Sequence, residues 1–445
     1  ISEGVGERNL FKVCIRDLAE HCEPVLVKEL INLIPEYGRW DDLLVLLDTP
    51  LKNHVLNLIK RQMSHDYNEM KAGRPITLLA KWLPSENATS QMTRANAKII
   101  YNYLNISPRK YRKQLSEMRK YLDVVERKMS SDNWQAIDYE KVPSIANLKY
   151  KDAFMRHDSE RRQMYLDALE SGEAKINSSV ANPPQIVDKY SKLLTYNYYY
   201  GTFNGKIDET LEAMWKALPD CVNGNSNTLV VADGSGSMCC PVSGKMSALA
   251  VANAMAIYFA ERAAGPFKNK YITFSSKPQL VNLDGESLIE NLGIAYKHDE
   301  CSNTDIEKTF DLILDTAVNN HLSQEDLPKN VLIISDMEFD YATCGRPNDP
   351  LFKTISNKFK KAGYRIPRLI FWNVNSRTGV IPARENEFGV ALVSGFSQNV
   401  LKMIMSEELD PYKLLVETLN SPRYDAVDKA IDESIKARKV MVKKV

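Results

Sequence analysis

Cysteine is scarce in this chain of 445 residues, and the spacing of its seven cysteines indicates no disulfide framework. Small secreted domains that depend on disulfides carry cysteines far more densely. A chain of this length holds two or three domains, each large enough to bury a core without such crosslinks. Scattered cysteines without a disulfide framework are typical of the reducing interior of a cell, so we expect a cytoplasmic protein.

Long hydrophobic runs and an excess of one charge are also missing. The longest apolar stretch, Ala248–Ala260, contains Asn253, whereas a membrane-spanning helix needs about 20 apolar residues. No membrane partner is expected. The net charge is +1, so the chain has no overall field that attracts nucleic acid, and any such affinity must come from a local patch.

Familiar catalytic motifs are absent as well. The six histidines form no His-Glu-x-x-His pair, and there is no Gly-x-Ser-x-Gly elbow. The segment from Gly234 to Lys245 resembles a phosphate-binding loop, but Cys239 and Met246 stand where that motif needs Gly and Ser or Thr. We expect a binding protein rather than an enzyme. A metal-dependent phosphohydrolase is the alternative class, although the sequence identifies no general base for it.

The first half of the chain has the periodicity of helices. Helices are predicted near residues 9–21, 25–34, 40–47, 91–104, 148–170 and 207–218. Ser107-Pro108 is typical of a helix start, and the apolar seam that follows predicts one helix of about 20 residues. No convincing strand precedes residue 220. Consecutive short helices predict an all-α helical-repeat, HEAT-like domain over residues 1–222.

The second half changes character after the polar segment 223–228. Short apolar runs at 229–232, 271–274, 331–334 and 369–372, with a weaker one at 389–393, alternate with helical patterns at 246–263, 304–318 and 350–362. This alternation predicts a doubly wound, mostly parallel α/β domain over residues 223–406. A helical tail over residues 407–445 ends in basic residues, which we interpret as a solvated helix end.

Oxygen-bearing side chains follow the first predicted strand. Asp233, Ser235 and Ser237 alternate with glycines, and ligands of parallel sheets bind at the carboxyl ends of strands. Thr304 at a loop mouth and Asp336 at the end of a later strand add two oxygens. This donor set suits Mg²⁺, with Mn²⁺ and Ca²⁺ as alternatives. The alternative interpretation of Asp233 and Ser235 is a strand-end turn with local side-chain caps. It does not explain why Thr304 and Asp336 stand where a metal site would need them.

These five residues, in this order, resemble the metal-ion-dependent adhesion site (MIDAS) of von Willebrand factor type A domains, over about residues 228–405. The resemblance implies that the serines and the threonine ligate the metal directly or through water. It also implies that an Asp or Glu carboxylate of a protein partner completes the octahedron.

Three segments of the helical half resemble an uncharacterised family of proteins related to the Ro autoantigen, which carry the TROVE module. They are Ile34–Leu44, Leu79–Pro84 and Ile137–Pro143. The resemblance implies a ribonucleoprotein component whose helical domain binds small structured RNA. A protein-only scaffold is the alternative, and the helical part is shorter than a Ro ring, so a closed ring is not predicted.

A cluster of basic residues in the helical half is a candidate RNA-binding surface. Residues 109–128 contain eight basic and three acidic side chains. All eight lie off the apolar seam and are expected to face outward, where phosphates bind. A merely solvated helix is the equal alternative. The basic residues are Arg109, Lys110, Arg112, Lys113, Arg119, Lys120, Arg127 and Lys128.

A group of aromatic residues and a group of cysteines suggest two further roles. An aromatic group can stack on bases, although ordinary packing is the more frequent role. It consists of Tyr196, Tyr198, Tyr199, Tyr200 and Phe203. Four cysteines fall in loops expected at the metal-bearing edge, where a redox or soft-metal role competes with the favoured interpretation as inert thiols. They are Cys239, Cys240, Cys301 and Cys344.

Overall fold

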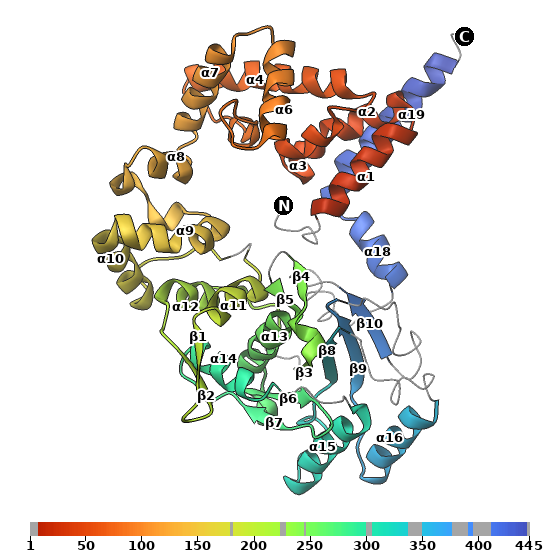
Figure 1. The fold of residues 1–445 in the computed structure, drawn as a ribbon. Helices are drawn as coiled ribbons and strands as arrows, with labels where there is room; N and C mark the ends of the chain where they lie inside the picture. Colours follow the sequence, from red (N-terminus) through yellow and green to blue (C-terminus); the bar gives the residue numbers. More distant parts are fainter. Residues whose placement is uncertain are drawn as a thin grey trace. The chain divides into compact units, whose positions relative to one another are not determined.

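The computed structural model describes residues 8–178, 181–222, 228–243, 246–299, 305–336, 349–375, 390–394 and 411–442. The chain divides into two compact units (Figure 1). One combines the residues up to Ile137 with those from Pro411 onward, and the other spans Asp138–Asp410. The predicted borders at residues 222 and 406 do not coincide with this division. Helices before residue 222 pack with the sheet, and the C-terminal helix packs on N-terminal helices.

The first unit is helical. Its N-terminal elements are α1 (Arg8–His21), α2 (Pro24–Asn32), α3 (Ile34–Tyr37), η1 (Trp40–Leu46), α4 (Lys52–Lys71), α5 (Leu79–Trp82), α6 (Gln91–Tyr103), α7 (Pro108–Tyr121), α8 (Val125–Ser130) and η2 (Trp134–Ala136). The apolar faces of the elements from α1 to α7 share one core, in which Leu43, Val55 and Ile100 are fully buried. The helix start is where it was predicted, because Ser107 Oγ accepts a hydrogen bond from Lys110 N at 3.2 Å.

The single long helix predicted after Ser107 is in fact two helices. α7 ends at Tyr121, and Asp123 has a φ of 51°, which a right-handed helix does not contain. α8 then begins at Val125. Leu122 and Val125 are both at least partly buried, so the apolar seam crosses the break. Hydrophobic periodicity therefore did not reveal it.

The C-terminal segment returns to the N-terminal helices. Its elements are α18 (Pro411–Leu419), η6 (Pro422–Tyr424) and α19 (Asp425–Val442). α19 lies along α2 (Figure 1). Arg438 forms a bidentate ion pair with Glu23, with N–O distances of 2.8 and 2.7 Å. The ring of Tyr37 stacks on that of Tyr424 with centroids 5.6 Å apart. The tail is thus part of a packed unit, and its helix is not simply a solvated end.

The second unit begins with helices and a hairpin. These elements are η3 (Tyr139–Lys141), α9 (Ser144–His157), α10 (Ser159–Glu170), α11 (Pro183–Ser191), β1 (Leu194–Asn197), β2 (Thr202–Gly205) and α12 (Glu209–Lys216). β1 and β2 pair antiparallel, with Tyr196 opposite Phe203. The prediction that no strand precedes residue 220 was wrong, because the aromatic run 196–203 contains a tight turn and pairs with itself.

A six-stranded sheet forms the centre of this unit. The elements from residue 228 to residue 394 are β3 (Thr228–Asp233), η4 (Gly236–Cys239), β4 (Pro241–Ser243), β5 (Met246–Ser247), α13 (Ala248–Arg262), η5 (Gly265–Phe267), β6 (Lys270–Phe274), β7 (Leu280–Asn282), α14 (Leu288–Lys297), α15 (Ile306–Asn319), β8 (Asn330–Ser335), α16 (Asp349–Lys361), β9 (Arg368–Asn373) and β10 (Val390–Ser394). β4 and β5 pair with each other outside the six-stranded sheet. The strand order is β10-β9-β8-β3-β6-β7, and only β7 is antiparallel to its neighbour. The predicted mostly parallel α/β architecture is confirmed.

Both faces of the sheet are covered, which explains the near-continuous apolar strands. Val230 and Leu332 belong to the core shared with α13 and α14, whereas their neighbours Val231 and Ile333 belong to the core shared with α15 and α16. α13 is buried along most of its length. Even so, no helix among the described residues combines the length and apolarity of a membrane span.

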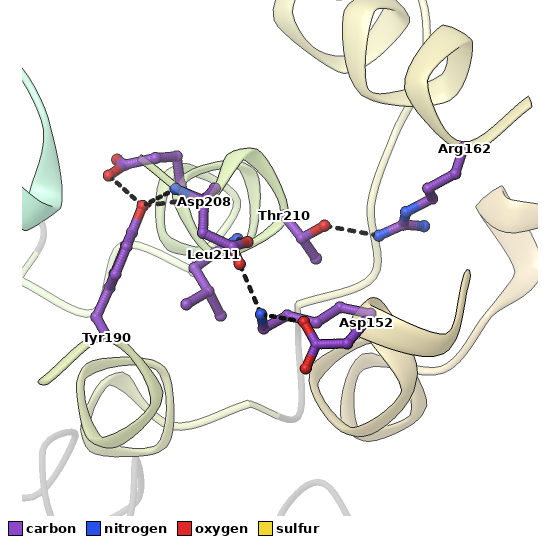
Figure 2. Close-up of polar contacts among 8 residues, drawn as sticks. Asp152, Arg162, Tyr190, Asp208, Thr210 and Leu211 are labelled. Carbon is purple, nitrogen blue, oxygen red and sulfur yellow. Dashed lines mark hydrogen bonds and ion pairs between the residues drawn. The ribbon is translucent and has the colours of Figure 1, made fainter. Parts of the chain in front are cut away.

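A polar network joins α9, α10, α11 and α12 (Figure 2). Lys151 Nζ bridges Asp152 and Asp208 at 2.8 and 2.6 Å, and Asp208 Oδ1 caps α12 by accepting from Leu211 N. Tyr190 OH donates to Asp208 O at 3.0 Å. Because α11 and α12 also share the apolar core of α13 and α14, this network ties the helices before residue 222 to the sheet.

Arg162 is fully buried in this layer. Its guanidinium donates to Thr210 Oγ1 at 3.0 Å (Figure 2) and to Asn147 Oδ1 at 3.3 Å. Its Cζ lies 4.9 and 5.2 Å from the ring centroids of Tyr139 and Tyr165. Among the described residues, no carboxylate forms an ion pair with it, and burial lowers its pKa. Aromatic rings therefore supply much of its stabilisation.

Arg162→Ala is expected to destabilise the second unit by roughly 3 kcal/mol or more, because it leaves a cavity among aromatic rings. Arg162→Met keeps most of the volume and removes a desolvated charge, so its effect should be much smaller. Urea denaturation followed by tyrosine and tryptophan fluorescence measures both. Equal losses in the two variants would show that the charge, and not the volume, is what this layer needs.

Candidate metal site and basic surface

Two aspartates end neighbouring strands of the sheet. Asp233 is the last residue of β3, and Asp336 follows Ser335, the last residue of β8. The two strands are parallel with Ala232 opposite Ile334, so both carboxylates emerge at the same edge. They are 2% and 1% exposed, respectively. The structure therefore brings these two predicted residues together in a buried position.

The turn after β3 places the hydroxyl of Ser235 beside Asp233 and that of Ser237 next to it. Asp233 Oδ1 accepts from Ser235 N at 2.9 Å, and its Oδ2 accepts from Ser335 Oγ at 2.6 Å. Ser235 Oγ and Ser237 Oγ lie 3.1 Å apart. Oxygens on adjacent corners of an Mg²⁺ octahedron with bonds near 2.1 Å stand about 3.0 Å apart. The hydroxyl spacing therefore fits two adjacent corners.

Burial dominates the electrostatics of this edge. It raises the pKa of Asp233; hydrogen bonds from Ser335 and Ser235 oppose the rise, and the charge of Asp336 adds to it. Two anionic carboxylates held near each other away from water repel one another. A bound cation would relieve this repulsion, which is the electrostatic condition that a metal site needs.

A third carboxylate near this edge was not predicted. Burial raises the pKa of Asp299 to about 7, and the charge of Asp233 contributes in the same direction. Asp299 Oδ2 accepts from Asn253 Nδ2 at 3.1 Å, and Asn253 is fully buried in α13. The sequence held one signal of this pair, because Asn253 interrupts the longest apolar run of the chain.

Among the described residues, no group of three or more His, Cys, Asp and Glu side chains is placed to hold a metal ion. A cation held by Asp233 and Asp336 would therefore need hydroxyls or water as its other ligands, as the two serines provide.

The remaining residues predicted at this edge divide into two groups. Thr304, Cys301 and Cys344 lie outside the described residues. Cys239 is exposed, Cys240 is half-buried, and neither forms a disulfide. The convergence of four cysteines thus stays a hypothesis.

The predicted basic cluster retains five exposed cations. Arg109, Lys110, Arg112, Lys113 and Lys120 are exposed on α7. The first four lie in the first two turns, and the first turn contains no acidic residue. Cations near a helix N-terminus are unfavourable to the helix dipole. Two of the five are paired within the chain, since Arg112 lies 3.5 Å from Glu86 and Lys113 lies 4.0 Å from Glu117. An external anion and an ordinary solvated helix both stay open as explanations of the cluster.

The other three basic residues are half-buried and also make contacts within the chain. Arg119 was expected to face outward, but it donates to Ala80 O at 2.7 Å and Leu83 O at 2.8 Å. Burial lowers its pKa. The prediction was wrong for this residue because a guanidinium can bind the carbonyls that end the neighbouring helix α5. Arg127 donates to Ser116 Oγ, and Lys128 pairs with Asp123.

Comparison with known proteins gives matches without an assigned activity. Two domains of unknown function match, DUF2828 over residues 76–227 and DUF7788 over residues 227–445. The chain is similar to the uncharacterized protein L728 of Acanthamoeba polyphaga mimivirus, with 28% identity over 94% of this chain and 77% of that protein.

One solved structure is also similar. The crystal structure of the Deinococcus radiodurans Ro (RSR) protein aligns over 90% of this chain and 88% of that chain, with 15% identity and a TM-score of 0.42. A score of this size does not establish a common fold. The HEAT-like, TROVE and von Willebrand A assignments therefore rest on the residues of this chain.

Proposed function

We propose that this protein is a non-enzymatic binding protein whose sheet unit recognises a partner's carboxylate through a divalent cation. The observation that carries the proposal is the meeting of Asp233 and Asp336 with the paired hydroxyls of Ser235 and Ser237 at one strand edge. These donors are all hard oxygens, which favour Mg²⁺ over zinc. Thr304 is the fifth proposed ligand.

The residues fit such an ion in number and charge. Two buried carboxylates balance a divalent charge, and the serine hydroxyls supply neutral ligands. The ion would act as a bridge between these side chains and an acidic group of the partner. Calorimetric titration with Mg²⁺ and Mn²⁺ tests the site, and phosphate release from a general phosphoester with Mn²⁺ tests the alternative, a phosphohydrolase.

We propose further that α7 binds RNA phosphates, as expected of a ribonucleoprotein component. The five exposed cations support this, and the four near its N-terminus add to the partial positive charge of the helix end. A 260/280 nm absorbance ratio of protein purified from its native host distinguishes an RNA binder from a protein-only scaffold, and sequencing of what copurifies identifies the RNA.

Reversing Arg109, Lys110, Arg112 and Lys113 to Glu is expected to weaken RNA binding and flatten its salt dependence. Each lost phosphate contact lowers the slope of log affinity on log salt by about 0.7–0.9. The fold should persist, because the four side chains are exposed and the ion pairs that are lost, Arg112–Glu86 and Lys113–Glu117, are surface pairs that contribute little to stability. Titration of a labelled RNA at several salt concentrations measures the slope.

A matched control separates this local effect from a change in net charge. Reversal of Lys60, Lys429, Lys436 and Lys439, which are exposed elsewhere in the same unit, alters the net charge equally. It should leave the slope nearly unchanged. If the slope of log affinity on log salt falls equally in both variants, or falls in neither, α7 is an ordinary solvated helix.

A further inference from the structure

The β1–β2 hairpin carries a group of exposed aromatic rings. Tyr198, Tyr199 and Tyr200 are 91%, 86% and 70% exposed, and Tyr196 is 43% exposed. Aromatic rings usually pack into cores, and we expected the same here. The structure contradicts that expectation for the turn, because its three consecutive tyrosines project from the tip of a hairpin.

The turn is held in a defined conformation. Asn197 Oδ1 accepts hydrogen bonds from Tyr199 N at 3.0 Å and Tyr200 N at 3.3 Å, and Gly201 N donates to Asn197 O at 2.9 Å. Gly201 has a φ of 60°, which glycine adopts without strain. The tyrosines are therefore presented by an ordered turn, so little backbone freedom is lost when they bind.

The base of the hairpin is anchored to the rest of the unit. β2 lies beside α14 (Figure 1), and the ring of Phe203 lies 5.7 Å from that of Tyr296. A Cβ added at Gly293 of α14 would come within 2.5 Å of Phe203 O. This close packing fixes the strands, while the tip extends beyond them.

The rings are arranged in two edge-to-face pairs. Tyr196 and Tyr198 have centroids 4.9 Å apart at 87°, and Tyr199 and Tyr200 have centroids 4.8 Å apart at 84°. In such a pair at least one ring face remains open. The exposure of the turn tyrosines shows that these faces are available to a flat ligand.

The hairpin itself carries no charge. Residues 194–205 contain no acidic or basic side chain, and the flanking segments contain both Lys189 and Lys206 and the acidic Asp208 and Glu209. Uncharged aromatic faces stack on bases, whereas phosphates bind cations, so this turn is suited to the base part of a single strand.

We infer that the turn Tyr198–Tyr200 stacks on the unpaired bases of single-stranded RNA. This inference rests on the proposed RNA binding and assigns it a second contact, in the sheet unit. A protein partner is less consistent with the hairpin, because a stable protein interface covers about 800 Å² on each side. A tip of a few residues is narrow for that purpose but matches the size of one or two bases.

The test is binding of fluorescently labelled oligouridine, a single strand without secondary structure, compared with an RNA duplex of equal length. Tyr198→Ala with Tyr199→Ala is expected to weaken oligouridine binding at least tenfold, since each stacked base contributes substantially. Its salt slope should stay unchanged because no phosphate contact is lost. Tyr198→Phe with Tyr199→Phe should retain binding, and Tyr412→Ala, an exposed tyrosine in the other unit, is the control.

The outcomes separate this inference from the proposed function. Wild-type binding of oligouridine that survives both alanine substitutions overturns the stacking role and leaves RNA binding by α7 intact. Equal affinity for the duplex, or loss of a copurifying protein instead of RNA in the alanine variant, also overturns it. Failure of the wild-type protein to bind either RNA refutes both proposals.

Discussion

Asp233→Asn is expected to abolish divalent-cation binding while the sheet unit stays folded. The affinity for Mg²⁺ should fall by at least about 100-fold, because even the loss of an outer-shell partner of a metal site costs 10–100-fold. The amide keeps the local hydrogen bonds: its oxygen can accept from Ser235 N, and the hydroxyl of Ser335 can accept from its NH₂ group.

The same substitution should stabilise the metal-free protein. Burial and the charge of Asp336 raise the pKa of Asp233, so its anionic form is unfavourable when no cation is bound. Isothermal titration with Mg²⁺ and Mn²⁺ measures the affinity, and thermal unfolding in chelator measures the stability. Asp315→Asn, on the exposed face of α15, is the control. Unchanged Mg²⁺ affinity in Asp233→Asn would place the ion elsewhere.

Asp299→Asn is expected to change how the stability of the metal-free protein depends on pH. The pKa of Asp299 is raised from its usual 3.8 to about 7 in the folded state. The folded protein therefore holds a proton that the unfolded chain has released, and stability falls as the pH rises from about 4 to about 7. Because Asp299 keeps some exposure to solvent, the loss is on the order of a few kcal/mol.

The variant should be as stable as the wild type near pH 4 and more stable at pH 8, because the substituted amide oxygen can still accept from Asn253 Nδ2. A weaker decline should persist, since Asp233 is shifted in the same direction. Urea unfolding in chelator at pH 4, 6 and 8 measures the difference. Parallel stability curves for the two proteins would show that Asp299 is ionised in the folded state.

Local sequence patterns predicted helices and strands well where a residue's neighbours in the sequence determine its secondary structure. The run Val331–Ile334 is apolar because both sheet faces are covered, and that run alone identified the strand. Ser107-Pro108 identified the start of α7 because a hydroxyl cap and a fixed proline φ are local features. The break at Asp123 escaped detection because apolar residues continue at helical spacing on both sides of it, at Leu122 and Val125.

For the proposed metal site, the sequence suggested the donor residues, and the sheet topology accounts for the meeting of Asp233 and Asp336. Asp233 and Asp336 each follow an apolar strand, and the rule that parallel strands share a carboxyl edge placed them together. Asp299 could not be found in this way. Its environment depends on α13, which lies far away in sequence and supplies Asn253.

By itself the sequence predicted a mostly helical first half, a mostly parallel sheet after it and the two strand-end aspartates Asp233 and Asp336, because burial periods and strand-end motifs are local. Only the tertiary structure decided that Arg119 points inward to α5, that α19 packs on α2 and that the tyrosine turn is exposed. These outcomes depend on which surfaces meet between distant segments. A side chain's own sequence neighbours do not specify the carbonyl, helix or solvent that it finally contacts.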